Sequence, residues 1–286
     1  MPRRQLGRYL RDLRNQAGLT VRAAARELER AEATIWRIET GQTSMRSVDV
    51  EIMCRLYGAP DEVMRALKAL AKETKAKGWW HAYGDILPDG FDVFIGLEEA
   101  TERLYWYESE LVPGLLQTEE YARTIMRAGL PDEAPDEIER RVQLRVARQR
   151  LLTRYTNPVE CSVVLGEMVL RRPIGERTMM AGQLHHLAEA SDLPNVTVRV
   201  VPSDTGLHLG VLSGPFGILR FPRTSDGKEV EPPIVYAEGL TGALYLDRAV
   251  ELEQYESVFG SIWNSALDAS ESRRLIIEWA GHHAEN

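Results

Sequence analysis

The sequence predicts two domains: an N-terminal all-α helix-turn-helix domain of about five helices, and a C-terminal α+β domain with a small sheet flanked by helices. Apolar residues recur at helical spacing through residues 1–77. Beyond residue 157, short runs rich in Val, Ile, Phe and Tyr are typical of strands, with helical segments around them. Residues 1–77 carry 16 Lys and Arg against 10 Asp and Glu, a net charge of +6, whereas residues 78–286 carry 19 against 33, a net charge of −14. We therefore predict the domains 1–77 and 78–286.

Composition and cysteine content exclude several classes of protein. No run approaches the roughly 18 apolar residues of a membrane span, and the N-terminal MPRRQLGRYL lacks an apolar signal region. We therefore expect a cytoplasmic protein that does not associate with a membrane. Cys54 and Cys161 lie in different predicted domains, without a CxxC motif. We expect small buried hydrophobic residues here, and neither a disulfide framework nor a zinc site.

The first three predicted helices form the centre of the N-terminal domain. The first spans Arg3 to Gln16, and Gly18 terminates it. Two short helices joined by a tight turn follow within Leu19–Gly41, where Thr20 can cap the first and Gly41 can end the second. Two helices of this size at a steep angle form the helix-turn-helix that fits a DNA major groove.

Two further helices complete this domain. Ser47 can cap the fourth, and Asp61–Lys77 is predicted to form the fifth. The predicted buried side of the fourth helix consists of Val48, Ile52, Met53 and Leu56. The predicted basic flank of the first helix consists of Arg4, Arg8, Arg11 and Arg14.

The exposed face of the third helix is predicted to read DNA. Arg37 can donate to guanine O6 and N7 or to a phosphate, and Trp36 can contact a thymine methyl group or the sugar backbone. Glu32 is repelled by phosphates and fits best as an acceptor from cytosine N4. The residues expected to contact DNA are Arg3, Arg4, Arg22, Glu32, Ala33, Thr34, Trp36, Arg37 and Arg46.

An alternative interpretation of this segment remains open. Two short amphipathic helices with a turn also occur in ordinary helical bundles, and an exposed Trp36 can serve as an inter-domain contact. The positive charge of residues 1–77 favours DNA, because binding to the backbone depends on phosphate neutralisation and counterion release.

The C-terminal domain is predicted to begin with an ordered connection and a helix over residues 95–111. Thr118 can cap the next helix, and residues 136–155 form a strong helix in which acidic residues precede arginines. Ser270 can cap the last helix. The remaining predicted helices span residues 176–191, 248–267 and 271–280, and the predicted strands span residues 159–165, 196–201, 215–221, 234–238 and 243–246.

No constellation in this domain predicts catalysis, a metal site or a cofactor. Nucleophile-elbow, HExxH, P-loop and dinucleotide glycine motifs are absent from the sequence, so we expect a protein that is not an enzyme. His185 and His186 point about 100° apart on a helix, which favours a structural or surface role for them and for His208 over a metal site. A strand-end ion pair is favoured over a polar site for Glu167 with Arg171 and Arg172, and a solvated, internally braced surface is favoured for the helix 136–155.

The N-terminal segment resembles the Xre (Cro/C1-type repressor) helix-turn-helix family. The resemblance rests on Leu19–Thr20, Ala25, Thr34–Ile35, Arg37–Ile38–Glu39 and Gly41. It implies a structural salt bridge between Arg14 and Glu39. The chain departs from the family at Val21, where Gln is frequent, and at Glu29-Arg30-Ala31, where Gly-Val-Ser is frequent.

The rest of the chain resembles an actinobacterial group of Xre-type regulators that share a C-terminal domain of poorly defined function. The resemblance rests on VPGLLQTEEYAR (112–123), RVARQRLL (145–152), GEMVLRR (166–172), QLHHLAE (183–189), VTVRVVP (196–202), GPFGILRF (214–221) and VYAEGLTGALYL (235–246). Members are often encoded beside a small partner protein and are described as transcriptional regulators or as antitoxin-like. The resemblance therefore implies regulation through such a partner.

These observations predict a sequence-specific, DNA-binding transcriptional regulator. We expect a homodimer on a paired operator, because one small helix-turn-helix makes too few contacts for useful specificity. The C-terminal domain is expected to dimerise, or to bind the partner protein or a small-molecule ligand. The alternative is an antitoxin-like protein that mainly sequesters its partner, with autoregulatory DNA binding.

Overall fold

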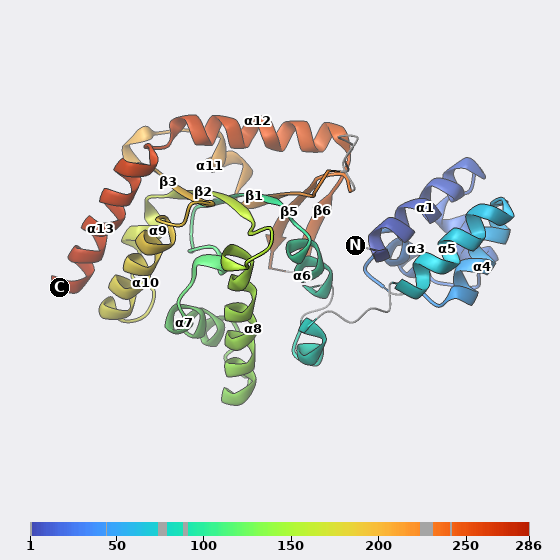
Figure 1. The fold of residues 1–286 in the computed structure, drawn as a ribbon, viewed down its shortest axis with the longest axis horizontal. Helices are drawn as coiled ribbons and strands as arrows, with labels where there is room; N and C mark the ends of the chain where they lie inside the picture. The colour runs from blue at the N-terminus through green and yellow to red at the C-terminus, as the bar shows by residue number, and fades with distance from the viewer. Residues whose placement is uncertain are drawn as a thin grey trace. The chain divides into compact units, whose positions relative to one another are not determined.

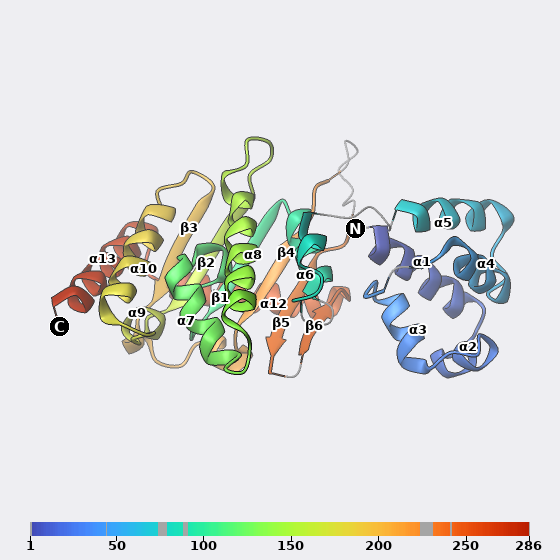
Figure 2. The same ribbon diagram turned by 90° about the horizontal axis from the view of Figure 1, so that it is seen from below.

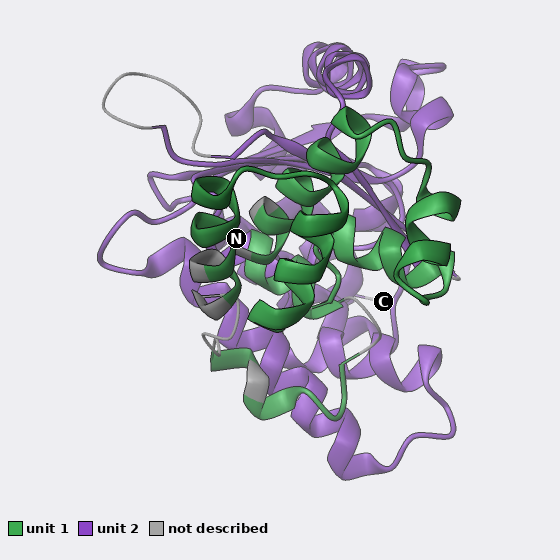
Figure 3. Ribbon diagram, turned by 90° about the vertical axis from the view of Figure 1, so that its right-hand side faces the viewer, with its two compact units in different colours: residues 1–97 green, residues 98–286 purple. Residues whose placement is uncertain are grey.

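The computed structural model describes residues 2–43, 45–73, 79–87, 91–223, 231–240 and 242–285. The chain divides into two compact units, which we call the first unit (residues 1–97) and the second unit (residues 98–286) (Figure 3). The boundary predicted from the sequence, between residues 77 and 78, lies outside the described residues.

The first unit contains the five predicted helices, and the predicted fold class is confirmed. Their bounds are α1 (Pro2–Gln16), α2 (Val21–Glu27), α3 (Glu32–Glu39), α4 (Ser47–Leu56) and α5 (Asp61–Glu73). The end predicted for the fifth helix, residues 74–77, lies outside the described residues. A 3₁₀ helix, η1 (Trp79–Tyr83), follows, and α6 (Phe91–Glu99) begins in the first unit and ends in the second.

The core of the first unit joins α1 to the helices around it. Leu6 and Leu10 of α1 are buried together with Ala24 of α2 and with residues of α4 and α5. Gly7 lies where α1 meets α3: a Cβ atom at this position would lie 2.5 Å from the carbonyl oxygen of Ile38. Only glycine therefore permits this close approach of the two backbones.

Helix α4 differs from the sequence prediction at its start and on its buried side. Arg46 occupies the N-cap position without a side-chain cap, and the Ser47 hydroxyl instead lies 3.4 Å from the carbonyl oxygen of Lys68. Val48 and Ile52 are 66% and 51% exposed, so their predicted burial was wrong. The side that α4 buries consists of Val50, Met53 and Cys54. Helix α4 has apolar residues on two sides, and packing against α1 and α5 selects one of them.

The second unit is built on a six-stranded mixed sheet with the order β3-β2-β1-β4-β5-β6. Strand β1 pairs in parallel with β2, and β2 pairs in parallel with β3, whereas the remaining pairs are antiparallel. The bounds are β1 (Arg103–Glu108), β2 (Glu160–Gly166), β3 (Val196–Val201), β4 (Phe216–Arg220), β5 (Ile234–Gly239) and β6 (Gly242–Leu246).

Strand β1 corrects the helix predicted over residues 95–111. Helix α6 ends at Glu99, and the aromatic-rich RLYWYE that follows forms a central strand of the sheet. Its side chains alternate between two covered faces: Tyr107 packs with α12, and Trp106 lies on the other face beside Tyr236 of β5. A strand covered on both sides carries apolar residues on both faces, as Leu104 to Tyr107 do here, so its alternating pattern is weak in the sequence.

Helices cover both faces of the sheet (Figures 1 and 2). Helix α12 lies along one face, where Phe259 and Ile262 belong to a core cluster with β1, β4 and β5, and α7 and α8 lie on the other face. The bounds are η2 (Gly114–Leu116), α7 (Glu119–Gly129), α8 (Pro135–Thr153), α9 (Met168–Arg171), α10 (Arg177–Ala190), η3 (Ser203–Thr205), α11 (Leu209–Ser213), α12 (Ala249–Ser265) and α13 (Ala269–Glu285). Among the described residues, no helix is long and apolar enough to span a membrane.

The caps of α7 and α13 show where local rules succeed and fail. The predicted cap of α7 is confirmed, because Thr118 Oγ1 accepts from the backbone N–H of Tyr121 at 3.3 Å. Ser270 does not cap α13. Asp268 Oδ1 accepts from the N–H of Glu271 at 2.8 Å, and the Glu271 carboxylate accepts from the N–H of Asp268 at 3.3 Å. Asp268 and Glu271 therefore form a capping box, in which Asp268 takes the capping role that was predicted for Ser270.

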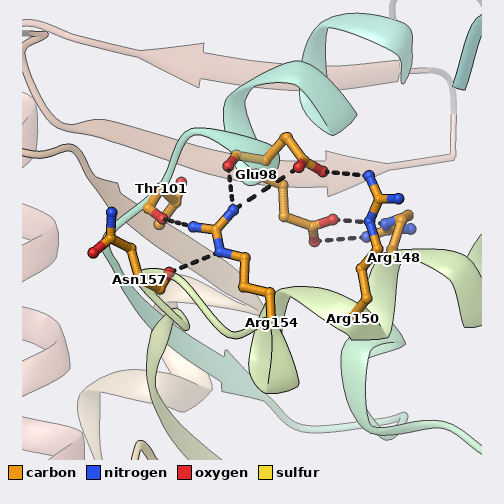
Figure 4. Close-up of polar contacts among 7 residues, drawn as sticks. Glu98, Thr101, Arg148, Arg150, Arg154 and Asn157 are labelled. Atoms are coloured by element: carbon orange, nitrogen blue, oxygen red, sulfur yellow. Dashed lines mark hydrogen bonds and ion pairs between the residues drawn. The ribbon is translucent and has the colours of Figure 1, made fainter. Parts of the chain in front are cut away.

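The arginine-rich helix α8 is attached to the segment before β1 and is not simply a solvated surface (Figure 4). The Arg148 guanidinium donates twice to the Glu98 carboxylate, at 2.7 Å each, and both side chains are buried. Arg154 donates to the carbonyl oxygens of Asn157 (2.7 Å) and Glu99 (3.0 Å). The interpretation of this helix as solvated and braced by its own acids was therefore wrong for these arginines. Its partners lie up to 55 residues away in the chain.

Candidate nucleic-acid interface

The helix-turn-helix is formed by α2, the turn at residues 28–31 and α3. Thr20 Oγ1 accepts from the N–H of Ala23 at 3.1 Å and caps α2, as predicted. Ala31 occupies the N-cap of α3 without a side-chain cap. Glu29 adopts a left-handed conformation with φ +51°, which glycine adopts at lower cost. The turn therefore forms without the family's Gly-Val-Ser.

Gly41 ends α3 and fits against α1. Its φ is +74°, and a Cβ atom at this position would lie 2.6 Å from the Cα of Arg4. Both the backbone conformation and the space require glycine here, so the predicted role of Gly41 is confirmed.

The outer face of α3 carries the side chains predicted to read DNA. Trp36 is 52% exposed, and Glu32, Ala33 and Arg37 are exposed beside it. Thr34 is half-buried and lines a cavity of about 180 Å³ between α3 and α4. Trp36 is thus not buried within the first unit, and the four exposed residues form one continuous face.

Two basic side chains are exposed on the flanks of this face. Arg22, in the first turn of α2, forms no ion pair with any residue that the structure describes, and the same holds for Arg37. Arg46 is exposed before α4 and pairs with Asp49 at 3.2 Å. A phosphate could replace Asp49, because an exposed pair of this kind contributes little to stability.

Arg3 and Arg4 lie elsewhere than the sequence predicted. Helix α1 begins at Pro2, so neither residue belongs to an extended arm. Arg3 donates to Asp92 at 2.8 Å, and Arg4 is only 5% exposed. The close approach of Gly41 to the Cα of Arg4 explains this burial. The structure therefore removes Arg4 from the surface predicted to contact phosphates.

A buried ion pair holds α3 against α1. Arg14 donates to both carboxylate oxygens of Glu39, at 2.6 and 2.8 Å, and also to the carbonyl oxygen of Leu19 at 2.7 Å. The hydrogen bond to Glu39 raises the pKa of Arg14, so the guanidinium stays charged. The pair that the family resemblance implied is thus present, and it links α1, the start of α2 and the end of α3.

Sequence reasoning missed two residues that support this arrangement. Tyr57 lies beside the ion pair, and its burial, together with the Glu39 carboxylate, raises the pKa of its hydroxyl. Gly7 provides the close contact between α1 and α3. A signal for Gly7 was present, because glycine inside a helix is unfavourable by about 1 kcal/mol relative to alanine and often marks a close approach.

The polar residues singled out in the second unit form structural contacts. His208 Nδ1 accepts from the N–H of Gly210 at 3.2 Å and caps α11. Glu167 pairs with Arg171 at 3.8 Å and accepts from the N–H of Ser203 at 2.7 Å, whereas Arg172 pairs with Glu110. No group of three or more His, Cys, Asp and Glu among the described residues is arranged to hold a metal ion.

Comparison with protein families agrees with this division of the chain. A model described as a helix-turn-helix domain matches residues 5–67, and a model described as a domain of unknown function (DUF5753) matches residues 91–278. No curated protein and no solved structure gave a match. The second model covers more than half of the chain. The protein therefore belongs to the DUF5753 family and carries a helix-turn-helix domain ahead of the domain that defines the family.

Proposed function

We propose that this protein is a sequence-specific, DNA-binding transcriptional regulator. The observation that supports this most strongly is the outer face of α3, where Trp36 and Arg37 are exposed while the buried Arg14–Glu39 pair holds the helix in place. Binding sites held on rigid elements present their side chains with little loss of entropy. The net charge of +6 on residues 1–77 supports the same proposal.

Each exposed side chain has a separate role in this proposal. Arg37 donates to guanine O6 and N7, Trp36 contacts a thymine methyl group, and Glu32 accepts from cytosine N4. Arg22 and Arg46 contact phosphates and set the register of the helix on the duplex. The regulator binds paired half-sites as a homodimer, since a single small module buries too little surface for tight specific binding.

The second unit supplies the regulatory input. We propose that it dimerises, or that it binds a partner protein or a small ligand, and that it acts through binding rather than catalysis. Its acidic composition supports a role away from DNA, because phosphates repel a surface with net negative charge. The resemblance to the Xre family and its actinobacterial group supports regulation through a small partner. A DNA-binding role agrees with a cytoplasmic location.

A second candidate function is supported by the resemblance of the second unit to antitoxin-like regulators. In that case the main task is to sequester a small partner protein, and DNA binding is autoregulatory. Co-purification of a stoichiometric small protein, encoded in a neighbouring gene, would favour this function over a purely ligand-driven regulator.

The proposal is tested by selecting a binding site from random duplexes and measuring the dissociation constant between about 50 and 200 mM salt. The affinity should fall steeply with salt, because counterions are released on binding. Arg37→Ala should weaken binding by about tenfold or more and relax the preference at one base step. Arg65→Ala removes an exposed arginine of α5 as a matched control and should change little.

Two outcomes of this experiment carry distinct meanings. An affinity that does not change with salt would contradict DNA binding driven by phosphate contacts. Equal weakening of Arg37→Ala on every sequence would assign Arg37 to a phosphate and remove it from base recognition.

A further inference from the structure

The two outer strands of the sheet, β3 and β6, differ in what lies beside them (Figures 1 and 2). Helix α13 and the segment before it hydrogen-bond to the outer edge of β3. The N–H of Val200 donates to Ser272 Oγ at 2.9 Å, and the carbonyl oxygen of Val200 accepts from the N–H of Leu267, also at 2.9 Å. The edge at β3 is therefore covered by the chain itself.

Strand β6, at the other end of the sheet, pairs with β5 alone. In an antiparallel ladder, every second residue of an outer strand directs its backbone N–H and C=O away from the neighbouring strand. Among the described residues, Ala243 and Leu244 form no backbone hydrogen bond outside the ladder with β5. The edge of β6 therefore keeps backbone donors and acceptors that can pair with a further strand.

This edge carries apolar side chains and none of the usual protection. Proteins commonly protect an open edge with Lys, with Pro or with a bulge. Residues 239–246 (GLTGALYL) contain no charged residue and no proline, and the register of β6 on β5 runs without a bulge. Leu240 is fully exposed and Leu244 is 60% exposed. These features indicate a strand that is paired in the assembled protein.

The sequence of β6 is complementary to a second copy of itself. When two copies pair antiparallel about Leu244, Gly242 of one copy lies opposite Leu246 of the other. Ala243 likewise lies opposite Tyr245, so each large side chain faces a small one. The segment is uncharged, so the pairing places no like charges directly opposite each other, although residues 78–286 carry a net charge of −14.

We propose that β6 is the dimerisation surface of this protein, where two copies pair antiparallel about a twofold axis through Leu244. The two six-stranded sheets then form one continuous sheet. Leu244 lies on the same face as Leu246, which packs against the core cluster that includes Phe259 of α12, so the two Leu244 side chains extend this apolar cluster across the axis. Because β3 is covered, each copy offers one open edge of the sheet and the assembly stops at two.

This inference deepens the proposed function and rests on it for its role, because a twofold dimer presents two helix-turn-helix domains to paired half-sites. The surface itself is tested on the full chain without DNA, so the two can fail separately. A dimer held by another surface would overturn this inference alone. A dimer held by β6 that does not bind DNA would overturn the proposed function alone.

Oxidative cross-linking of cysteine variants tests the register. Residues directly opposite in an antiparallel pair have Cα atoms about 4.5 or 5.5 Å apart, which a disulfide can span. Leu244→Cys should therefore form a disulfide-linked dimer, and the native Cys54 and Cys161 are buried and should not contribute.

Leu240→Cys is the matched control for this cross-link. Leu240 is more exposed than Leu244, so random collisions would favour its cross-linking. It lies beyond Gly242, however, whose two copies are about 14 Å apart in the proposed register. Leu240→Cys should therefore cross-link at least about tenfold more slowly than Leu244→Cys, because a disulfide cannot span this distance.

Sedimentation equilibrium provides a second readout, in which the wild type should have twice the mass of one chain. Leu244→Lys removes an apolar contact from both copies and places two like charges opposite each other, so it should weaken the dimer by about tenfold or more. Leu212→Lys, at a 71% exposed leucine of α11, is the matched control and should dimerise as the wild type does. The proposal is overturned if the wild type is a monomer, if the two cysteine variants cross-link equally fast, or if Leu244→Lys leaves the dimer unchanged.

Discussion

At the scale of single residues, the position of α3 depends on the buried pair of Arg14 and Glu39. Both side chains are less than a tenth exposed, and the guanidinium also binds the carbonyl oxygen at the start of the α2 segment. A buried pair of this kind contributes little net stability compared with apolar residues of the same shape, but losing one partner leaves a charge without compensation. The pair therefore specifies the angle of the helix that we propose reads DNA.

Glu39→Gln should lower the free energy of unfolding by about 3 kcal/mol, because Arg14 stays charged and buried without its counter-ion. Urea denaturation of the full chain measures this change. Glu27→Gln is the control: its partner Arg26 is 82% exposed, so the free energy of unfolding should hardly change. Equal losses in the two variants would show that burial of the pair is unimportant.

Glu108 at the end of β1 makes the stability of the second unit depend on pH. Burial raises its pKa to about 7 from 4.5, and the nearby Glu238 and Glu110 carboxylates act in the same direction, against a hydrogen bond from Trp106. Between pH 4.5 and about pH 7, the Glu108 carboxyl is protonated in the folded state and ionised in the unfolded state. The free energy of unfolding therefore decreases as the pH rises through this window.

Glu108→Gln removes this ionisation and keeps an oxygen that can accept from Trp106. Relative to the wild type, the variant should gain stability from about pH 4 to pH 8, by at most about 3 kcal/mol. Thermal unfolding at the two pH values measures the difference. The control is Glu102→Gln, which removes a carboxylate from an exposed position. A gain that does not change with pH would contradict the assignment.

At the scale of elements, the contact between α1 and α3 depends on the absence of a side chain at Gly7. A Cβ atom there would lie 2.5 Å from the carbonyl oxygen of Ile38 and 2.7 Å from that of Glu39, and both are backbone atoms that cannot rotate away. The two helices would have to separate, and the Arg14–Glu39 pair would be disturbed with them.

Gly7→Ala should therefore lower the free energy of unfolding by about 2 kcal/mol and weaken DNA binding, although alanine favours helix formation. Gly182→Ala in α10 is the matched control, because a Cβ atom there meets nothing within 4 Å, and it should stabilise the protein by up to about 1 kcal/mol. Chemical denaturation and DNA binding measured together would test both effects. Stabilisation by Gly7→Ala would refute the close contact.

Elements also differ in how much the sequence reveals about them. Helix α8 was predicted nearly to its ends and the start of α7 was predicted at Thr118, because acidic first turns, a capping hydroxyl and an apolar period are local features. Strand β1 was mistaken for helix, because a strand covered on both faces shows little alternation. The buried side of α4 was assigned correctly at Met53 but wrongly at Val48 and Ile52, because both sides of the helix carry apolar residues and only the position of α1 and α5 selects between them.

At the scale of the whole molecule, each of the two units has a core of its own. The first unit is built around α1, and the second around the sheet and its covering helices. The basic charge lies in the first unit up to residue 77, and the acidic charge in the rest of the chain. This separation agrees with the proposed function, in which the first unit binds DNA and the second binds a ligand or partner.

Scanning calorimetry of the full chain should therefore resolve two unfolding transitions. Arg148→Met leaves Glu98 buried without its partner and should lower only the transition of the second unit. Glu39→Gln should lower only that of the first. The two variants serve as controls for each other. A single transition that both variants shift together would show that the units unfold as one.

The sequence by itself determined the two-part division, the helix-turn-helix and the exposed residues Glu32, Trp36 and Arg37. These features follow from charge, helical period and capping, which depend on residues close together in the chain. The salt bridge of Arg14 with Glu39 was accessible only through the family resemblance.

Only the tertiary structure decided the burial of Arg4, the pairing of Arg148 with Glu98, and the burial of a His283 ring nitrogen that has no hydrogen-bond partner among the described residues. Each depends on which distant segment packs against the side chain. Arg148 and Glu98 are 50 residues apart, and His283 and Leu170 are 113 apart. Local patterns establish which residues form a helix and which side of it is polar. Contacts between distant segments decide whether a polar side chain faces water, a partner or a cavity, because burial is a property of the packed chain.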